Sequence, residues 1–192
     1  MKLAIATVAA LASLAAAGAS AQQVHCDDLK ALVAAAEADF APLRGPLIRK
    51  ETVADLAREN GVPPSALAGL DYQRQVFAAG GPRPKGATCD VSVARIKDEE
   101  SDLAQSAYRC SWQGVPGFVA LKKSLAACLP AAERHEDPES VYLAVERVVS
   151  GEGYRSIVVS AEANPLQDVV LSIEKSVCLN RSEGGCDDAD DE

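Results

Sequence analysis

Few residues of this 192-residue chain are of the types and spacing that catalysis needs. The run Ser172-Ile173-Glu174-Lys175 has the S-x-x-K spacing of serine acyl-transferases. In those enzymes a turn of helix places the lysine beside the serine hydroxyl. Here the run lies in an apolar stretch that predicts a β-strand, in which residues i and i+3 point to opposite faces. We therefore expect no catalytic pair of Ser172 and Lys175.

The two histidines are also poorly placed for chemistry. His25 stands four residues after Ala21, the end of an N-terminal segment that we expect to be cleaved. His135 lies in the charged stretch 133–138, which predicts a surface linker. The acidic stretch 186–192 lacks the glycine turn and the ligand spacing of a calcium loop. These patterns predict no catalytic residue, no cofactor and no metal site.

The cysteines, six in number, all follow residue 21. An even number of cysteines in an exported chain predicts disulfides. Zinc is disfavoured because the chain has no C-x-x-C pair and only two histidines. The sequence leaves the connectivity open, but the expected elements favour pairing Cys26 with Cys128, Cys89 with Cys110, and Cys178 with Cys186.

The N-terminal segment 1–21 has the features of a cleaved secretory signal peptide. Lys2 precedes the apolar run 3–17, and Ala19-Ser20-Ala21 offers the small residues that signal peptidase requires. The run is shorter than the roughly 20 residues that span a bilayer, and no L-x-x-C lipidation box is present. We expect a mature chain from Gln22 that is periplasmic or secreted, with no membrane anchor.

Length and charge limit the remaining possibilities. Residues 22–180 have the length of a single domain, and 181–192 form an acidic tail that we expect to be flexible. The chain carries a formal net charge of −9. This charge disfavours nucleic acid as a partner, because phosphate contacts need clustered Lys and Arg.

Periodicity predicts both helices and strands, without an internal sequence repeat. Apolar residues at a spacing of 3.6 predict main helices over 26–40 and 118–129, with short helical pieces over 52–60 and 64–70. Alternating or β-rich runs predict strands over 89–96, 108–112, 141–149, 154–159 and 169–177. The expected fold class is α+β: an antiparallel sheet of about five strands with two main helices on one face, stapled by disulfides.

Residues 52–67 resemble the helix-turn-helix of bacterial repressors. Ala57 stands at the small position of the first helix and Gly61 at the turn. The segment 64–70, which would read DNA, has no Arg, Lys, Asn or Gln to contact bases. We therefore expect two short packed helices and no DNA binding.

The loop 80–86 is the most basic exposed stretch that the sequence predicts. Arg83 and Lys85 alternate with prolines there, and we take these two residues as a tentative binding loop. We expect a non-catalytic protein that binds another macromolecule, such as an inhibitor, an immunity-type protein or an envelope accessory factor. The alternatives are an envelope hydrolase whose Asp, Glu and Ser residues are dispersed along the sequence, and a carrier of a small apolar ligand.

Overall fold

The computed structural model describes residues 24–113, 118–150, 153–163 and 168–180. The expected signal peptide and acidic tail lie outside these residues. The described part of the chain contains eight β-strands: β1 (Arg44–Thr52), β2 (Asp71–Ala79), β3 (Thr88–Lys97), β4 (Ser101–Gln113), β5 (Glu133–Glu136), β6 (Ser140–Ser150), β7 (Gly153–Ala163) and β8 (Asp168–Asn180). It also contains the α-helices α1 (Cys26–Ala36), α2 (Val53–Glu59) and α3 (Phe118–Cys128), and the 3-10 helices η1 (Ala41–Leu43) and η2 (Pro64–Leu67).

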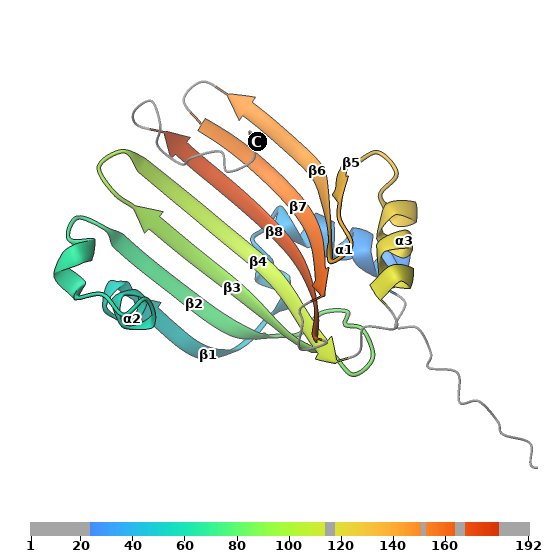
Figure 1. Ribbon diagram of the computed structural model, residues 1–192, viewed down its shortest axis with the longest axis horizontal. Helices are drawn as coiled ribbons and strands as arrows, with labels where there is room; N and C mark the ends of the chain where they lie inside the picture. The colour runs from blue at the N-terminus through green and yellow to red at the C-terminus, as the bar shows by residue number, and fades with distance from the viewer. Residues whose placement is uncertain (1–23, 114–117, 151–152, 164–167, 181–192) are drawn as a thin grey trace, which may run out of the picture.

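All eight strands form one antiparallel sheet in the order β1-β2-β3-β4-β8-β7-β6-β5 (Figure 1). The order reveals two halves with the same topology, because α1 precedes the meander β1–β4 and α3 precedes the meander β5–β8. The last strands of the halves, β4 and β8, pair in the middle of the sheet. The topology is therefore duplicated although the sequence is not.

The hydrophobic core lies between the sheet and the pair α1 and α3. Leu29 and Leu32 of α1 and Leu121 and Leu125 of α3 are at most 2% exposed. They belong to one cluster with residues that alternate along the central strands: Val91, Tyr108, Cys110, Trp112, Ile157, Val159, Leu171 and Ile173. The contact of α1 with α3, and of both with β7, places the two helices on the same side of the sheet.

The expected α+β sheet of about five strands and two main helices is wrong. Strand accounts for 54% of the described structure and helix for 25%, so the molecule is dominated by its sheet. A strand is present at each of the five expected stretches. The three missed strands are β1, β2 and β5, and α2 is a third helix, set between β1 and β2.

Two expected disulfides are confirmed. Cys26 at the start of α1 is bonded to Cys128 at the end of α3, and Cys89 of β3 is bonded to its cross-strand partner Cys110 of β4. Cys178 is also disulfide-bonded, and its expected partner Cys186 lies outside the described residues. Disulfides are typical of oxidising compartments outside the cytosol. None of the helices described is long and apolar enough to cross a membrane.

Candidate binding face

The two faces of the sheet differ in what covers them. Side chains alternate along each strand, so the residues between those of the core point away from α1 and α3. We call this second side the open face. Among the described helices, α2 borders one corner of it at the ends of β1 and β2, where the helix makes its sheet contacts. The other two described α-helices, α1 and α3, pack on the opposite side.

An apolar stripe crosses the open face at right angles to the strands. Its members are successive Cα partners in the register of six neighbouring strands, and they run in the order Tyr72, Ile96, Leu103, Cys178, Tyr154 and Val149. The side chain of Val149 is 68% exposed, whereas Cys178 is buried and disulfide-bonded. At a strand spacing of about 4.8 Å, the five gaps give the stripe a length of about 24 Å.

The rows beside the stripe carry mainly small, polar and charged side chains, with two valines. The first runs from Arg74 through Ala94, Gln105, Ser176 and Ser156 to Arg147, and the second from Val76 through Ser92, Ala107, Glu174 and Val158 to Ala144. Ser92, Ala94 and Ala107 are too short to fill the space above the sheet. They form the floor of a hollow of about 270 Å³, which we call the trough. Its other lining residues are Tyr72, Arg74, Ile96, Gln105, Arg109 and Glu174.

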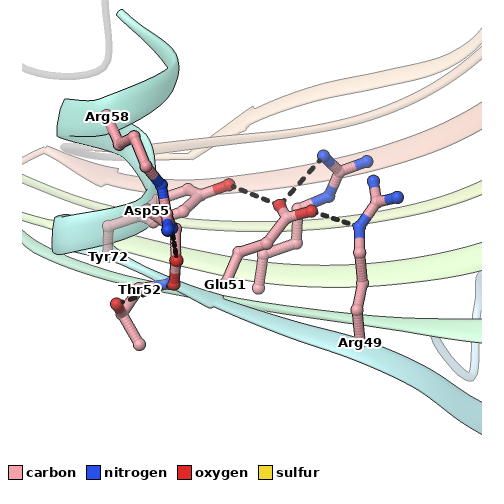
Figure 2. Close-up of polar contacts among 7 residues, drawn as sticks. Arg49, Glu51, Thr52, Asp55, Arg58 and Tyr72 are labelled. Atoms are coloured by element: carbon pink, nitrogen blue, oxygen red, sulfur yellow. Dashed lines mark hydrogen bonds and ion pairs between the residues drawn. The ribbon is translucent and has the colours of Figure 1, made fainter. Parts of the chain in front are cut away.

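A buried carboxylate, whose polar contacts are drawn in Figure 2, holds Arg74 at one wall of the trough. Glu51 of β1 is 7% exposed and accepts hydrogen bonds from the guanidinium groups of Arg49 and Arg74, the second at 3.3 Å. The hydroxyl of Tyr72 approaches the same carboxylate at 3.5 Å, which is long for a hydrogen bond. Burial is the main cause that raises the pKa of Tyr72, so the hydroxyl keeps the proton that it directs at Glu51.

The turn that follows Glu51 is held by the start of α2. The Thr52 backbone N–H and hydroxyl both lie 2.9 Å from Oδ2 of Asp55, which also pairs with Arg58 (Figure 2). The backbone hydrogen bond from Thr52 is the main cause that lowers the pKa of Asp55. This capping arrangement ends β1 one residue after Glu51 and thereby fixes where its carboxylate lies.

Arg109 of β4 forms part of the opposite wall. Its side chain is exposed, and it takes part in no ion pair or side-chain hydrogen bond within the described residues. Glu174 lies diagonally across from it on β8, and Asp90 is its partner on β3. The residue of β8 that pairs with Arg109 is Ser172, which is 7% exposed. The Oγ of Ser172 makes no hydrogen bond in the described structure. The guanidinium of Arg109 thus keeps all five of its donors for another molecule.

The structure places the tentative loop residues Arg83 and Lys85 away from the apolar stripe. Both are exposed in the connection from β2 to β3, and the stripe crosses β3 at its other end, at Ile96. The loop is anchored because the Tyr108 hydroxyl donates to the carbonyl of Pro82 at 2.6 Å. Burial raises the pKa of Tyr108, which keeps this donor protonated. The role of Arg83 and Lys85 as a binding loop remains a prediction.

The other candidate residues do not assemble into a reactive site. Ser172 is on the open face, whereas Lys175 contacts Asp39 at 2.9 Å on the helix side, as expected for a strand. His25 precedes α1, and His135 lies in the edge strand β5, not in a linker as expected, beside Tyr142. Within the described ranges, no group of three or more His, Cys, Asp or Glu is placed to hold a metal ion.

Comparison with protein-family models, with curated proteins and with solved structures gives no significant match. The function is therefore inferred from the geometry of the open face. Sequence reasoning missed Tyr72, Arg74 and Arg109 as candidate residues. The segment 71–79 offered little signal for the first two, because polar and apolar residues do not alternate regularly there, and Arg109 gains its meaning only from its neighbours on β3 and β8.

Proposed function

We propose that this chain is a non-catalytic protein of the periplasm or the extracellular space that binds another protein through the open face. The observation that carries the proposal is the apolar stripe, which is bordered by rows of small and charged residues on a face that α1 and α3 do not cover. Stable protein interfaces have such an apolar centre with a polar rim. Tyr and Arg, found here at Tyr72, Arg74 and Arg109, are the residue types enriched at binding hot spots.

The size of the open face suits a protein partner. Eight strands leave seven gaps, so the sheet is about 34 Å wide, and a ten-residue strand such as β3 is about 33 Å long. The outline of about 1,100 Å² exceeds the roughly 800 Å² that each partner contributes to a standard interface. The trough, at about 270 Å³, is smaller than the roughly 300–1,000 Å³ of small-molecule pockets. A second hollow, of about 490 Å³, lies by the start of α2 and is within that range, but most of its lining residues are polar or charged, so it does not favour a carrier of an apolar ligand.

The disulfides support the proposed compartment. Cys26–Cys128 and Cys89–Cys110 are formed, and such bonds persist in the periplasm and outside the cell. The N-terminal segment 1–21, with its apolar run and its small-residue end, supports export to the same compartment.

A matched pair of valine substitutions tests the proposal. The oxidised, tagged protein is used to capture partners from the native envelope under gentle crosslinking, followed by mass spectrometry. Val149→Asp places a charge on the apolar stripe, and Val119→Asp places the same charge on α3, where the valine is 61% exposed. We expect one partner in near-equal amount, lost with Val149→Asp and kept with Val119→Asp.

Two other results would redirect the search. A partner lost only when Arg83 and Lys85 are changed to Glu would place binding on the loop 80–86 and refute the open face. Recovery of no specific partner by the unchanged protein would refute the binding function and lead to assays for hydrolysis and for small ligands.

A further inference from the structure

We infer that the trough receives a carboxylate side chain of the partner, with Arg109 as the group that binds it. The inference rests on the proposed function and adds the chemistry of the partner: an acidic residue next to an apolar one. The acidic residue enters the trough, and its apolar neighbour lies on the stripe.

The shape of the trough leaves room for one side chain between two arginines. Arg74 is on β2 and Arg109 on β4, with β3 between them. They are two strand gaps apart across the sheet, about 10 Å, and four residues apart along the strands, about 13 Å, which makes about 16 Å between their Cα atoms. The floor between them is made of Ser92, Ala94 and Ala107, whose side chains do not reach into this space. A partner side chain that enters therefore displaces no protein group.

The two arginines are in different electrostatic states. Arg74 is 28% exposed and donates to Glu51, which it shares with Arg49. Arg109 is exposed and has no ion pair among the described residues, although Asp90 and Glu174 lie on neighbouring strands. A planar guanidinium with free donors matches a carboxylate in a bidentate arrangement. Arg109 is therefore the binding group, and Glu51 is a positioning residue that holds Arg74 at the opposite wall.

The charge around the trough accommodates one anion and not many. Arg49, Arg74 and Arg109 balance Glu51, Asp90 and Glu174, so these six residues sum to zero on a chain of net charge −9. Local neutrality lets a single carboxylate approach an arginine without strong repulsion. A polyanion such as nucleic acid would extend over the acidic remainder of the surface and be repelled. The ligand class that fits is an isolated Asp or Glu on a protein.

The adjacent stripe defines the second half of the ligand. Tyr72 and Ile96 line the trough and also belong to the apolar stripe. A partner residue next to the bound carboxylate therefore meets apolar surface. Acetyl-Leu-Asp-Leu-amide contains both elements and is a suitable probe, and acetyl-Leu-Asn-Leu-amide is its neutral isostere.

Side-chain nuclear magnetic resonance can report on Arg109 directly. The Nε–Hε signal of Arg109 is followed while each peptide is added to the folded, oxidised protein. We expect the Asp peptide to shift this signal saturably, with the Asn peptide binding about tenfold more weakly because it lacks the charge-assisted pair. Arg109→Gln should abolish the preference for Asp, whereas the matched Arg83→Gln should leave it unchanged.

Each alternative result contradicts the inference in a specific way. Equal binding of the two peptides, or an unchanged preference in Arg109→Gln, would exclude Arg109 as the carboxylate site. The absence of any Arg109 shift at peptide concentrations of about 10 mM, well above the roughly millimolar range of weak contacts, would exclude the trough. Urea unfolding of Arg109→Gln shows whether the variant is folded.

The peptide and capture experiments separate the two proposals. A partner that is lost with Val149→Asp but kept with Arg109→Gln would leave the open face as the interface and refute the carboxylate site. A clear preference for the Asp peptide without any envelope partner would support the site chemistry and refute the protein-binding function.

Discussion

The two described disulfides should contribute unequally to stability, in the order of the loops that they close. The helix bridge, Cys26–Cys128, joins residues 102 apart, and the strand bridge, Cys89–Cys110, joins residues 21 apart. A cross-link stabilises mainly by restricting the unfolded chain, and the effect grows with the logarithm of loop length. The loop-entropy relation gives about 4.7 kcal/mol for the helix bridge and about 3.3 kcal/mol for the strand bridge. The expected difference is about 1.4 kcal/mol.

The assay must separate cross-linking from packing, because Cys89, Cys110 and Cys128 are buried whereas Cys26 is exposed. We would prepare two variants that each keep one bridge and carry alanine at the other four cysteines. Urea unfolding of each variant, oxidised and then reduced, gives the free energy of its bridge with the sulfur atoms still in place. A contribution of the strand bridge equal to or larger than that of the helix bridge would refute the loop-entropy argument.

Three further predictions concern single side chains. Glu51→Ala should lower the free energy of unfolding by about 1–2 kcal/mol. This is less than the roughly 3–5 kcal/mol lost when a fully buried ion pair is broken, because water can reach the released Arg74. The fall in Tm measures the effect, and an unchanged Tm would contradict it. Hydrogen bonds, first from the Ser140 hydroxyl, hold the pKa of Asp137 below its usual 3.8, so its contribution to stability is present above about pH 4 and lost as the pH falls through the folded pKa. Asp137→Asn should therefore flatten the dependence of urea stability on pH between about 5 and 2, and an unchanged slope would count against this cause. Tyr108→Phe removes the hydrogen bond to the 80–86 loop and should lower the free energy of unfolding by about 1 kcal/mol. Amide hydrogen exchange should become faster in that loop alone. Faster exchange across the whole sheet would show that the hydroxyl does not act by anchoring the loop.

The sequence predicted the strands of the second meander better than those of the first. β6, β7 and β8 are rich in Val and Ile, and the sequence between them contains Gly or Asn-Pro, which are turn signals, so their composition and spacing agree. β1 has the sequence RGPLIRKET, in which Pro and Gly are signals of loops. It forms an edge strand, and its register with β2 shifts at two points, which is where Pro is tolerated in a sheet.

β5 and β2 were missed for a different reason. β5 consists of the four exposed residues ERHE at the other edge of the sheet. Its pairing with β6, and not its composition, makes it a strand. In β2 the polar residues Gln73 and Gln75 stand on the helix side, in line with the core residue Phe77, so the alternation of polar and apolar residues is weak. Local periodicity fails where tertiary pairing provides the stabilisation.

The open face could not be derived from sequence because the register creates it. Ile96 and Leu103 are seven residues apart, but Leu103 and Cys178 become neighbours only when β8 is inserted beside β4. The two confirmed cysteine pairings could be predicted from the sequence, because each requires only that two elements lie side by side. A row across six strands needs five correct registers, and an error of one residue in any of them moves its side chain to the other face.

The duplicated topology explains why the open face is continuous. Tyr72, Ile96 and Leu103 of the stripe come from the first meander, and Tyr154 and Val149 from the second. Because α1 and α3 contact one another and are joined by the helix bridge, both halves place their helix on the same side of the sheet. If the two helices lay on opposite sides, one of them would lie over the open face and cover its half of the stripe. The pairing of β4 with β8 and the helix bridge thus act together: the first joins two short apolar rows into one, and the second keeps α1 and α3 together on the side of the sheet away from that row.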